Sequence, residues 1–285
     1  MASTTMYSQT DFKILPDEEQ LNQLDRALRF HPVTTPSPQV LTQEEIERYN
    51  REGYLKGYSI FDQTEADDLR SYFDQLLEKV LAEGGDSYSI ISAHLKYGRI
   101  YDLVKHPKIV SYVTDILGQD AVCWGAHFFC KLPHDPKKVA WHQDASFWPL
   151  TPSKTTTVWL AIDDADTENA CMRFVSGSHH HGHLTYRIAE EAEQSVLRQS
   201  VDEVEQYGTP VDDDLKAGEI SLHSDLLLHG SDANHSARRR CGLTLRYCAA
   251  EVWSDPALGW NKEGVIVSGS DARGHWGNPE RPTQE

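Results

Sequence analysis

The stretch AVCWGAHFFCKL, Ala121–Leu132, is rich in apolar, aromatic and β-branched residues and has no helical spacing. Such runs are typical of β-strands. Similar runs follow: TTTVWLAID (155–163), CMRFV (171–175), AGEISLHSDLLLHG (217–230) and GLTLRYCAAEVW (242–253). Only IAEEAEQSVLRQSVDEV (188–204) could supply a helix between them. The pattern therefore favours antiparallel sheets closed as a jelly roll over a parallel sheet with crossover helices.

The sequence before Ala121 has helical spacing instead. A capping box of Thr42 and Glu45 predicts a helix start in LTQEEIERYN (41–50). In TEADDLRSYFDQLLEKVLAEGG (64–85), the expected buried stripe is Leu69, Tyr72, Phe73, Leu76 and Val80. In HPKIVSYVTDILG (106–118), it is Val110, Val113 and Leu117. The predicted fold is mainly β with flanking helices, around a double-stranded β-helix (jelly-roll, cupin-like) core.

The length allows one large domain. With 285 residues, 39% of them hydrophobic, the chain can bury a substantial core. The turn-rich segment TTPSPQV (34–40) predicts a boundary between an N-terminal arm, residues 1–40, and a single domain, residues 41–285. Within that domain we expect a helical part at 41–118 and a jelly-roll core with a C-terminal extension at 119–285.

Charge and cysteine content narrow the class of protein. A net charge of −17 argues against nucleic-acid and anionic-membrane partners. Residues 1–20 lack a basic start followed by an apolar run, so we expect neither a signal peptide nor a membrane span. Five cysteines without CxxC spacing fit buried thiols in a reducing compartment. We expect a cytoplasmic protein that acts on a small-molecule substrate; whether it is a monomer or a homodimer stays open.

The segment VAWHQDASFWPL, Val139–Leu150, carries a possible metal site. In a strand, His142 and Asp144 share one face while Gln143 lies on the other. Taken alone, the pair fits a hydrogen-bonded surface pair better. His229, at the end of a later apolar strand, could complete the set of two histidines and one carboxylate that holds non-haem iron. The chain has 14 histidines, so spacing alone does not select His229.

Three pieces of the sequence together resemble the phytanoyl-CoA dioxygenase family of iron(II)- and 2-oxoglutarate-dependent oxygenases. They are WHQDASFWPLTP (141–152), TVWLAIDDADTENACMRFVSGSH (157–179) and the block from HGSDANHS (229–236) to RRCGLTLRY (239–247). The resemblance covers most of the chain from about Leu41 onward. It implies that His142, Asp144 and His229 bind iron and that Arg240 binds the far carboxylate of 2-oxoglutarate.

The resemblance also implies the cofactors and the supporting residues. Ser231 would assist at the carboxylate that Arg240 binds, and Trp159 and His127 would line the cosubstrate pocket, with core packing as the alternative for both. The implied reaction uses Fe(II), 2-oxoglutarate and O2, with ascorbate as a reductant in vitro, to hydroxylate a C–H bond with release of succinate and CO2. Related halogenases have a small residue in place of the carboxylate of Asp144, so its presence disfavours halogenation.

Binding of 2-oxoglutarate requires an arginine for a chemical reason as well. The far carboxylate of a chelated 2-oxoglutarate is buried, and a charge-assisted, bidentate partner offsets its desolvation. Arg238 and Arg239 compete with Arg240 for this role. Arg240 has the inward parity in the strand that runs on into CGLTLRY (241–247).

The substrate is less constrained. If the strand before His229 is regular, Asp225 shares its face and could contact an amine or hydroxyl of the substrate. The alternative is that Asp225 caps a turn. Phe147 and Trp148 could form a pocket wall or a buried aromatic pair. These features favour a small polar metabolite over a fatty acyl-CoA, while a small phosphate or phosphonate held by Lys96 or Arg99 stays open.

Other functions remain open at this point. The same iron centre could serve desaturation or ring formation in natural-product metabolism. The chain could also be a cupin-like isomerase, or a non-catalytic jelly-roll binding protein. The cluster SHHHGH (178–183) resembles the family's Pro-Gly-Ser-His turn, with Ser176 in place of the proline, so we interpret it as a turn and not as a metal site.

Overall fold

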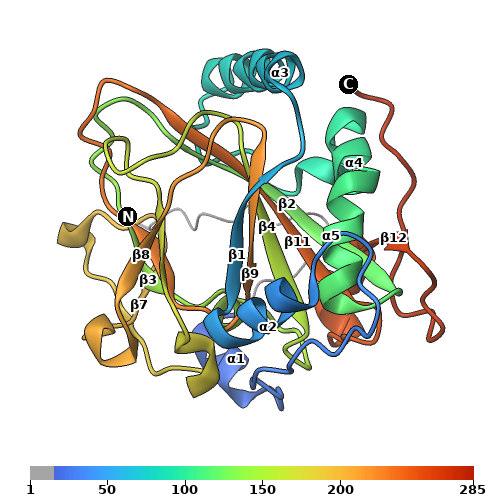
Figure 1. Cartoon of the computed structure of the whole chain (residues 1–285). Helices are drawn as coiled ribbons and strands as arrows, with labels where there is room; N and C mark the ends of the chain where they lie inside the picture. Colours follow the sequence, from blue (N-terminus) through green and yellow to red (C-terminus); the bar gives the residue numbers. More distant parts are fainter. Residues whose placement is uncertain (1–15) are drawn as a thin grey trace.

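Two facing antiparallel sheets form the centre of the molecule. The computed structural model describes residues 16–285. The larger sheet has the strand order β1-β9-β4-β11-β2-β12 and the smaller sheet has the order β3-β10-β5-β8. Figure 1 shows the larger sheet in the middle of the molecule and β3 and β8 on its far side from α4 and α5. The predicted jelly-roll fold with flanking helices is therefore confirmed.

The strands follow the predicted apolar runs. Their bounds are β1 Tyr54–Ser59, β2 Ala121–Lys131, β3 Val139–His142, β4 Thr155–Ala161, β5 Met172–Val175, β6 Arg187–Ile188, β7 Gln199–Ser200, β8 Pro210–Asp213, β9 Glu219–Ser224, β10 His229–Ser231, β11 Arg240–Ala249 and β12 Val265–Ser268. Neighbours in the larger sheet are far apart in sequence, so the sheet forms only when the chain folds back on itself.

The helices lie mostly before β2. Their bounds are α1 Glu18–Gln23, α2 Gln43–Glu52, α3 Gln63–Ala82, α4 Gly98–Val104 and α5 Pro107–Leu117. Short 3-10 turns are η1 Ala93–Leu95, η2 Asp144–Phe147, η3 Ser178–His181, η4 Glu191–Glu193, η5 Val204–Tyr207, η6 Pro256–Leu258 and η7 Trp260–Glu263. The capping box of Thr42 and Glu45 is present at the start of α2, as predicted. Among the helices of residues 16–285, none is long and apolar enough to cross a membrane.

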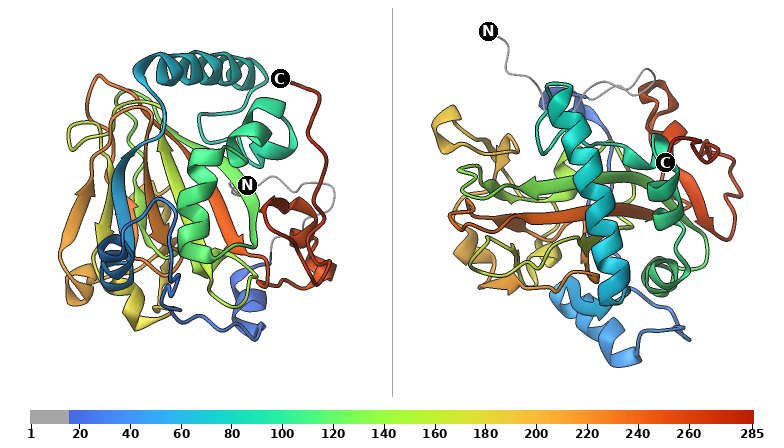
Figure 2. Two further views of the ribbon diagram at one scale, coloured as in Figure 1. Left: turned by 45° about the vertical axis from the view of Figure 1, so that its right-hand side comes forward. Right: turned by 90° about the horizontal axis from the view of Figure 1, so that it is seen from above.

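The main core lies between the helices and the outer face of the larger sheet. Figure 2 shows α3 crossing over the end of the sheets, and α4 and α5 contact β2. Alternation along β11 decides which residues join this core: Leu243, Leu245 and Tyr247 are fully buried in it. The residues of opposite parity face the smaller sheet, and that inner space holds the candidate site.

The structure resolves one point that the sequence left open and corrects the expected buried face of α5. Residues 188–204 form no helix, only the short strands β6 and β7 and a 3-10 turn. The buried face of α5 contains Ile109, Val113 and Ile116, while Val110 and Leu117 are only partly buried. The face is rotated because α5 contacts β2, β4, β11 and β12 together. Helices α1 and α4 carried no signal that we interpreted.

The predicted N-terminal arm is described only from residue 16 onward. This part packs on the body of the protein: the Arg26 guanidinium donates to the carbonyls of Ala145 and Trp148, at 2.9 and 2.8 Å. The division at residue 40 stays a prediction. All five cysteines are buried and free, as expected.

Candidate metal centre and cosubstrate pocket

Two histidines and one carboxylate meet between the two sheets. His142 ends β3, Asp144 begins the following 3-10 turn η2, and His229 begins β10 directly opposite His142 in the antiparallel ladder. One Asp144 oxygen, Oδ1, lies 3.8 Å from His142 Nε2 and 3.9 Å from His229 Nε2. All three residues are buried, and one ligand atom from each lies within 4.8 Å of the others. The sequence prediction that these residues converge is confirmed.

Backbone carbonyls orient both imidazoles. His142 Nδ1 lies 2.8 Å from the Ala140 carbonyl, and His229 Nδ1 lies 2.9 Å from the Leu227 carbonyl. Because a carbonyl only accepts, Nδ1 carries the hydrogen and Nε2 presents its lone pair to the centre. Burial lowers the pKa of both histidines, which keeps the rings neutral. Neutral imidazoles and a carboxylate are the donor set that suits a divalent iron ion.

Asp144 is supported on its other oxygen. Thr157 Oγ1 donates to Asp144 Oδ2 at 2.8 Å, and His223 Nε2 lies 3.6 Å from the same oxygen. Burial by itself would raise the pKa of Asp144, but the nearby His223, His229 and Arg246 lower it well below its usual range. The carboxylate therefore stays ionised, with Oδ1 directed at the two imidazoles.

Of the three consecutive arginines, Arg240 alone lines the cavity next to the triad. Its Nε donates to the Ala170 carbonyl at 3.0 Å and its Nη2 donates to Ser231 Oγ at 2.9 Å. Arg238 pairs with Asp166 and Glu168, and Arg239 pairs with Asp163 and Asp74. The parity prediction therefore placed Arg240 correctly, beside Ser231.

Both polar and apolar side chains line the cavity that contains the triad. Trp159 lies against Gly242 of β11, where an added Cβ would be 2.0 Å from Trp159 Cζ2. The same indole lies under the Arg240 guanidinium, 5.7 Å from ring centre to Cζ. The lining residues are Phe129, Val139, His142, Asp144, Phe147, Thr157, Trp159, Met172, Leu197, His223, His229, Gly230, Ser231, Arg240, Thr244 and Arg246.

Three other predicted site residues, Asp225, Trp148 and His127, do not line the cavity of the triad. The parity argument for Asp225 was wrong, because β9 ends at Ser224 and a turn follows. Asp225 does not line the cavity, and its carboxylate accepts a hydrogen bond from Ser153 Oγ at 2.6 Å. Trp148 packs against Trp124, outside the cavity wall.

His127 was also predicted to line the cosubstrate pocket, and it lies outside the cavity wall. Its Nδ1 accepts a hydrogen bond from Arg246 at 2.8 Å. Phe147, in contrast, lines the cavity with its ring 5.7 Å from that of His142.

Sequence reasoning missed three residues of the site, namely Thr157, His223 and Arg246. Two of them carried a usable signal, since Arg246 has the same strand parity as Arg240 and Thr157 the same parity as Trp159. His223 carried none, because a single histidine in an apolar strand is indistinguishable from a core residue.

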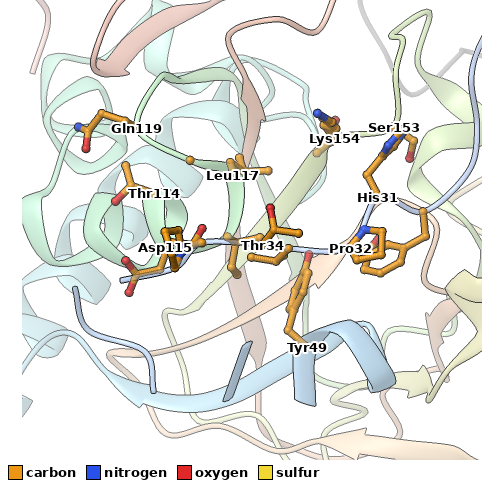
Figure 3. A pocket seen from close by; sticks show the side chains of 18 of the residues that line it. His31, Pro32, Thr34, Tyr49, Thr114, Asp115, Leu117, Gln119, Ser153 and Lys154 are labelled. Atoms are coloured by element: carbon orange, nitrogen blue, oxygen red, sulfur yellow. The ribbon is translucent and has the colours of Figure 1, made fainter. Parts of the chain in front are cut away.

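A second hollow, of about 430 Å³, lies apart from the triad (Figure 3). It is bounded by the segment 30–39, the end of α5 and the start of β4. Asp115 lies in its wall, but the carboxylate is already occupied by the backbone N–H groups of Gln39, Val40 and Leu41. Within the part of the chain that the structure describes, no second group of metal-binding residues was found beside His142, Asp144 and His229.

The histidine-rich stretch is a turn, as predicted. Gly177 adopts a left-handed conformation with φ of 80°, and residues 178–181 form the 3-10 turn η3. His179 is buried and its Nε2 lies 3.0 Å from the Asn50 carbonyl, so it anchors this turn to α2.

Comparison with known proteins agrees with this geometry. The family model for phytanoyl-CoA dioxygenase (PhyH) matches residues 37–242. The chain belongs to the phytanoyl-CoA dioxygenase family. Among curated proteins, a probable alpha-ketoglutarate-dependent hypophosphite dioxygenase of Stutzerimonas stutzeri is 32% identical over 185 residues, which cover 62% of this chain and 63% of that protein.

Two further similarities support the assignment to the PhyH family. Phytanoyl-CoA dioxygenase domain-containing protein 1 of Bos taurus is 32% identical over 166 residues, 54% of this chain and 55% of that protein. The chain thus matches less than two thirds of either relative's length. Among solved structures, the non-haem monooxygenase ThoJ in its apo form is 26% identical with a TM-score of 0.70, covering 84% of this chain and 88% of that one.

Proposed function

We propose that this protein is an Fe(II)- and 2-oxoglutarate-dependent dioxygenase that hydroxylates a C–H bond of a small polar metabolite and releases succinate and CO2. The observation that carries the proposal is the convergence of His142, Asp144 and His229 with Arg240 in one cavity. A metal-binding triad alone would fit many proteins. A buried arginine that faces the same cavity adds the partner that a chelating dicarboxylate needs.

Different residues of the site would bind the metal and the cosubstrate. His142, His229 and Asp144 would hold the iron on one side only and leave its other positions open for ligands. A bound iron(II) with 2-oxoglutarate and O2 would supply the oxidising chemistry. The carbonyl contacts on both Nδ1 atoms fix the imidazoles, and Thr157 fixes the carboxylate, so the ligand geometry is set before a metal binds.

Arg240 and Ser231 would hold the far carboxylate of 2-oxoglutarate. Two of the five guanidinium N–H groups are used within the protein, which leaves three for a ligand. The Trp159 ring lies 5.7 Å from the guanidinium carbon and would keep bulk water from the carboxylate, which would strengthen the contact. The wall residues Phe147, Leu197 and Met172 add apolar surface to a small cavity, which favours a small substrate over a long acyl chain.

The direct test is the formation of succinate from 2-oxoglutarate. Purified protein with Fe(II), ascorbate and air should release succinate, and metabolites that increase this rate become substrate candidates. A product heavier by one oxygen atom supports hydroxylation. A product lighter by two hydrogens would replace it with desaturation or ring formation.

The matched control is His142→Ala, which removes one ligand and leaves Arg240 in place. It should form no succinate above the rate seen without protein. Wild-type protein that binds iron and forms no succinate under any metabolite would contradict the proposal and favour a non-catalytic binding protein.

A further inference from the structure

A second arginine, Arg246, lies on the same inner face of β11 as Arg240. It is buried, with 4% of its surface exposed, and it lines the cavity of the triad. In the larger sheet it is paired with Thr157 of β4, and Thr157 is paired in turn with His223 of β9. The three side chains therefore form a row across the sheet, next to Asp144.

The surroundings of Arg246 fix its guanidinium in one place. Nη1 donates to His127 Nδ1 at 2.8 Å. The indoles of Trp124 and Trp148 lie 5.7 and 5.3 Å from Arg246 Cζ. Trp124 is backed by Trp260 of the C-terminal extension, with ring centres 5.5 Å apart. An aromatic enclosure of this kind holds a cation by cation–π attraction without neutralising it.

In the described part of the chain, no carboxylate contacts the Arg246 guanidinium directly. Among residues 16–285, none of its nitrogens forms an ion pair with Asp or Glu, and Nε is buried without a hydrogen-bond partner. Arg238 and Arg239 on the outer surface each have two acidic partners. Asp144 is near enough to feel the charge, but its oxygens are directed at Thr157 and at the two imidazoles. A buried, unpaired cation is costly unless a ligand supplies the anion.

Arg246 and Arg240 line the same cavity from separate positions of β11. They are six positions apart in sequence, which is about 20 Å along β11. If Arg240 holds the far carboxylate of 2-oxoglutarate, Arg246 lies beyond the metal, on the side left for the substrate. The match to the family model ends at residue 242, so Arg246 and the tryptophans of the C-terminal extension lie outside the matched region.

We propose that Arg246 is the receptor for an oxyanion of the substrate, namely a carboxylate, phosphate or phosphonate close to the C–H bond that reacts. The inference rests on the proposed function for the identity of the site, and it names the substrate class. It replaces the amine-binding role expected for Asp225, which lies outside the cavity. It also replaces Lys96 and Arg99 as anion partners, because neither lines the cavity and Arg99 pairs with Asp68.

The test is binding of small anions to the metal-loaded protein with 2-oxoglutarate, kept free of oxygen. The probes are methylphosphonate and propionate, with neutral propionamide and cationic ethylamine as comparisons. Tryptophan fluorescence reports on the site directly, since Trp124 and Trp148 flank the guanidinium. Wild-type protein should bind at least one anion and neither comparison compound.

The decisive variant is Arg246→Gln, which keeps a polar side chain and removes the charge. Loss of one side of a buried charged contact should weaken anion binding by at least about thirtyfold. Arg246→Lys, which keeps the charge, should lose less. The matched control is Arg238→Gln, on the exposed side of the same segment, which should bind the anion as wild type does.

Each result has one meaning. Equal anion binding by Arg246→Gln and wild type, or tighter binding of propionamide than propionate, overturns the proposal. If Arg246→Gln fails to unfold cooperatively, Arg246→Lys is used in its place. Weaker binding of propionate by Arg246→Lys than by wild type then supports the proposal, and equal binding overturns it. If wild type forms succinate from 2-oxoglutarate but binds no anion, the oxyanion receptor is wrong and the proposed function stands. If it forms none, the proposed function itself fails.

Discussion

Replacing Arg240 by glutamine should abolish tight binding of 2-oxoglutarate without removing the metal site. Arg240 has three N–H groups left after its bonds to Ala170 and Ser231, enough for a bidentate contact with a carboxylate. Breaking a buried ion pair of this kind costs about 3–5 kcal/mol. The affinity for 2-oxoglutarate should therefore fall by at least about a hundredfold.

The assay is titration of 2-oxoglutarate into metal-loaded protein in the absence of oxygen, with metal affinity measured separately. Arg239→Gln is the matched control, because it removes the neighbouring positive charge from a half-buried pair with Asp163. That variant should be less stable and should bind 2-oxoglutarate normally. If Arg239→Gln lost the affinity and Arg240→Gln kept it, the assignment of the cosubstrate site would be refuted.

Other perturbations test the metal site, the packing and the pH response. His142→Ala should weaken Fe(II) binding by more than the ~10–100-fold that a supporting contact contributes, measured by anaerobic titration, while exposed His181→Ala should bind Fe(II) as wild type does. Gly242→Ala should cost about 1–3 kcal/mol in urea unfolding, because its Cβ collides with Trp159; an unchanged midpoint would contradict the packing. Burial lowers the pKa of His179 to about 4, below the unfolded value. Its contribution to stability is therefore present above about pH 6.5 and is lost as the pH falls toward 4. His179→Gln should flatten the dependence of the unfolding free energy on pH in that window, and an unaltered slope would count against the assignment.

The β-rich runs in the sequence were sufficient to predict the fold class, and strand alternation predicted the face of Arg240, whereas the set of metal-binding residues followed from the resemblance to the family. Period-two alternation is a local property, since successive side chains must leave a strand on opposite faces. It placed Arg240 inside while Arg238 and Arg239 form outer ion pairs. The helix cap at Thr42 could also be predicted from the sequence, because its hydrogen bonds join residues only three positions apart.

Only the tertiary structure decided which distant residues meet. Asp225 has the right parity relative to His229, but a turn after Ser224 breaks the strand and moves its carboxylate to Ser153. Thr157, His223 and Arg246 come together because β4 lies between β9 and β11, an order set by hydrogen bonds between segments far apart in the chain. Alternation fixes the face of a residue, whereas pairing and register fix its neighbours, and these depend on packing of the whole sheet.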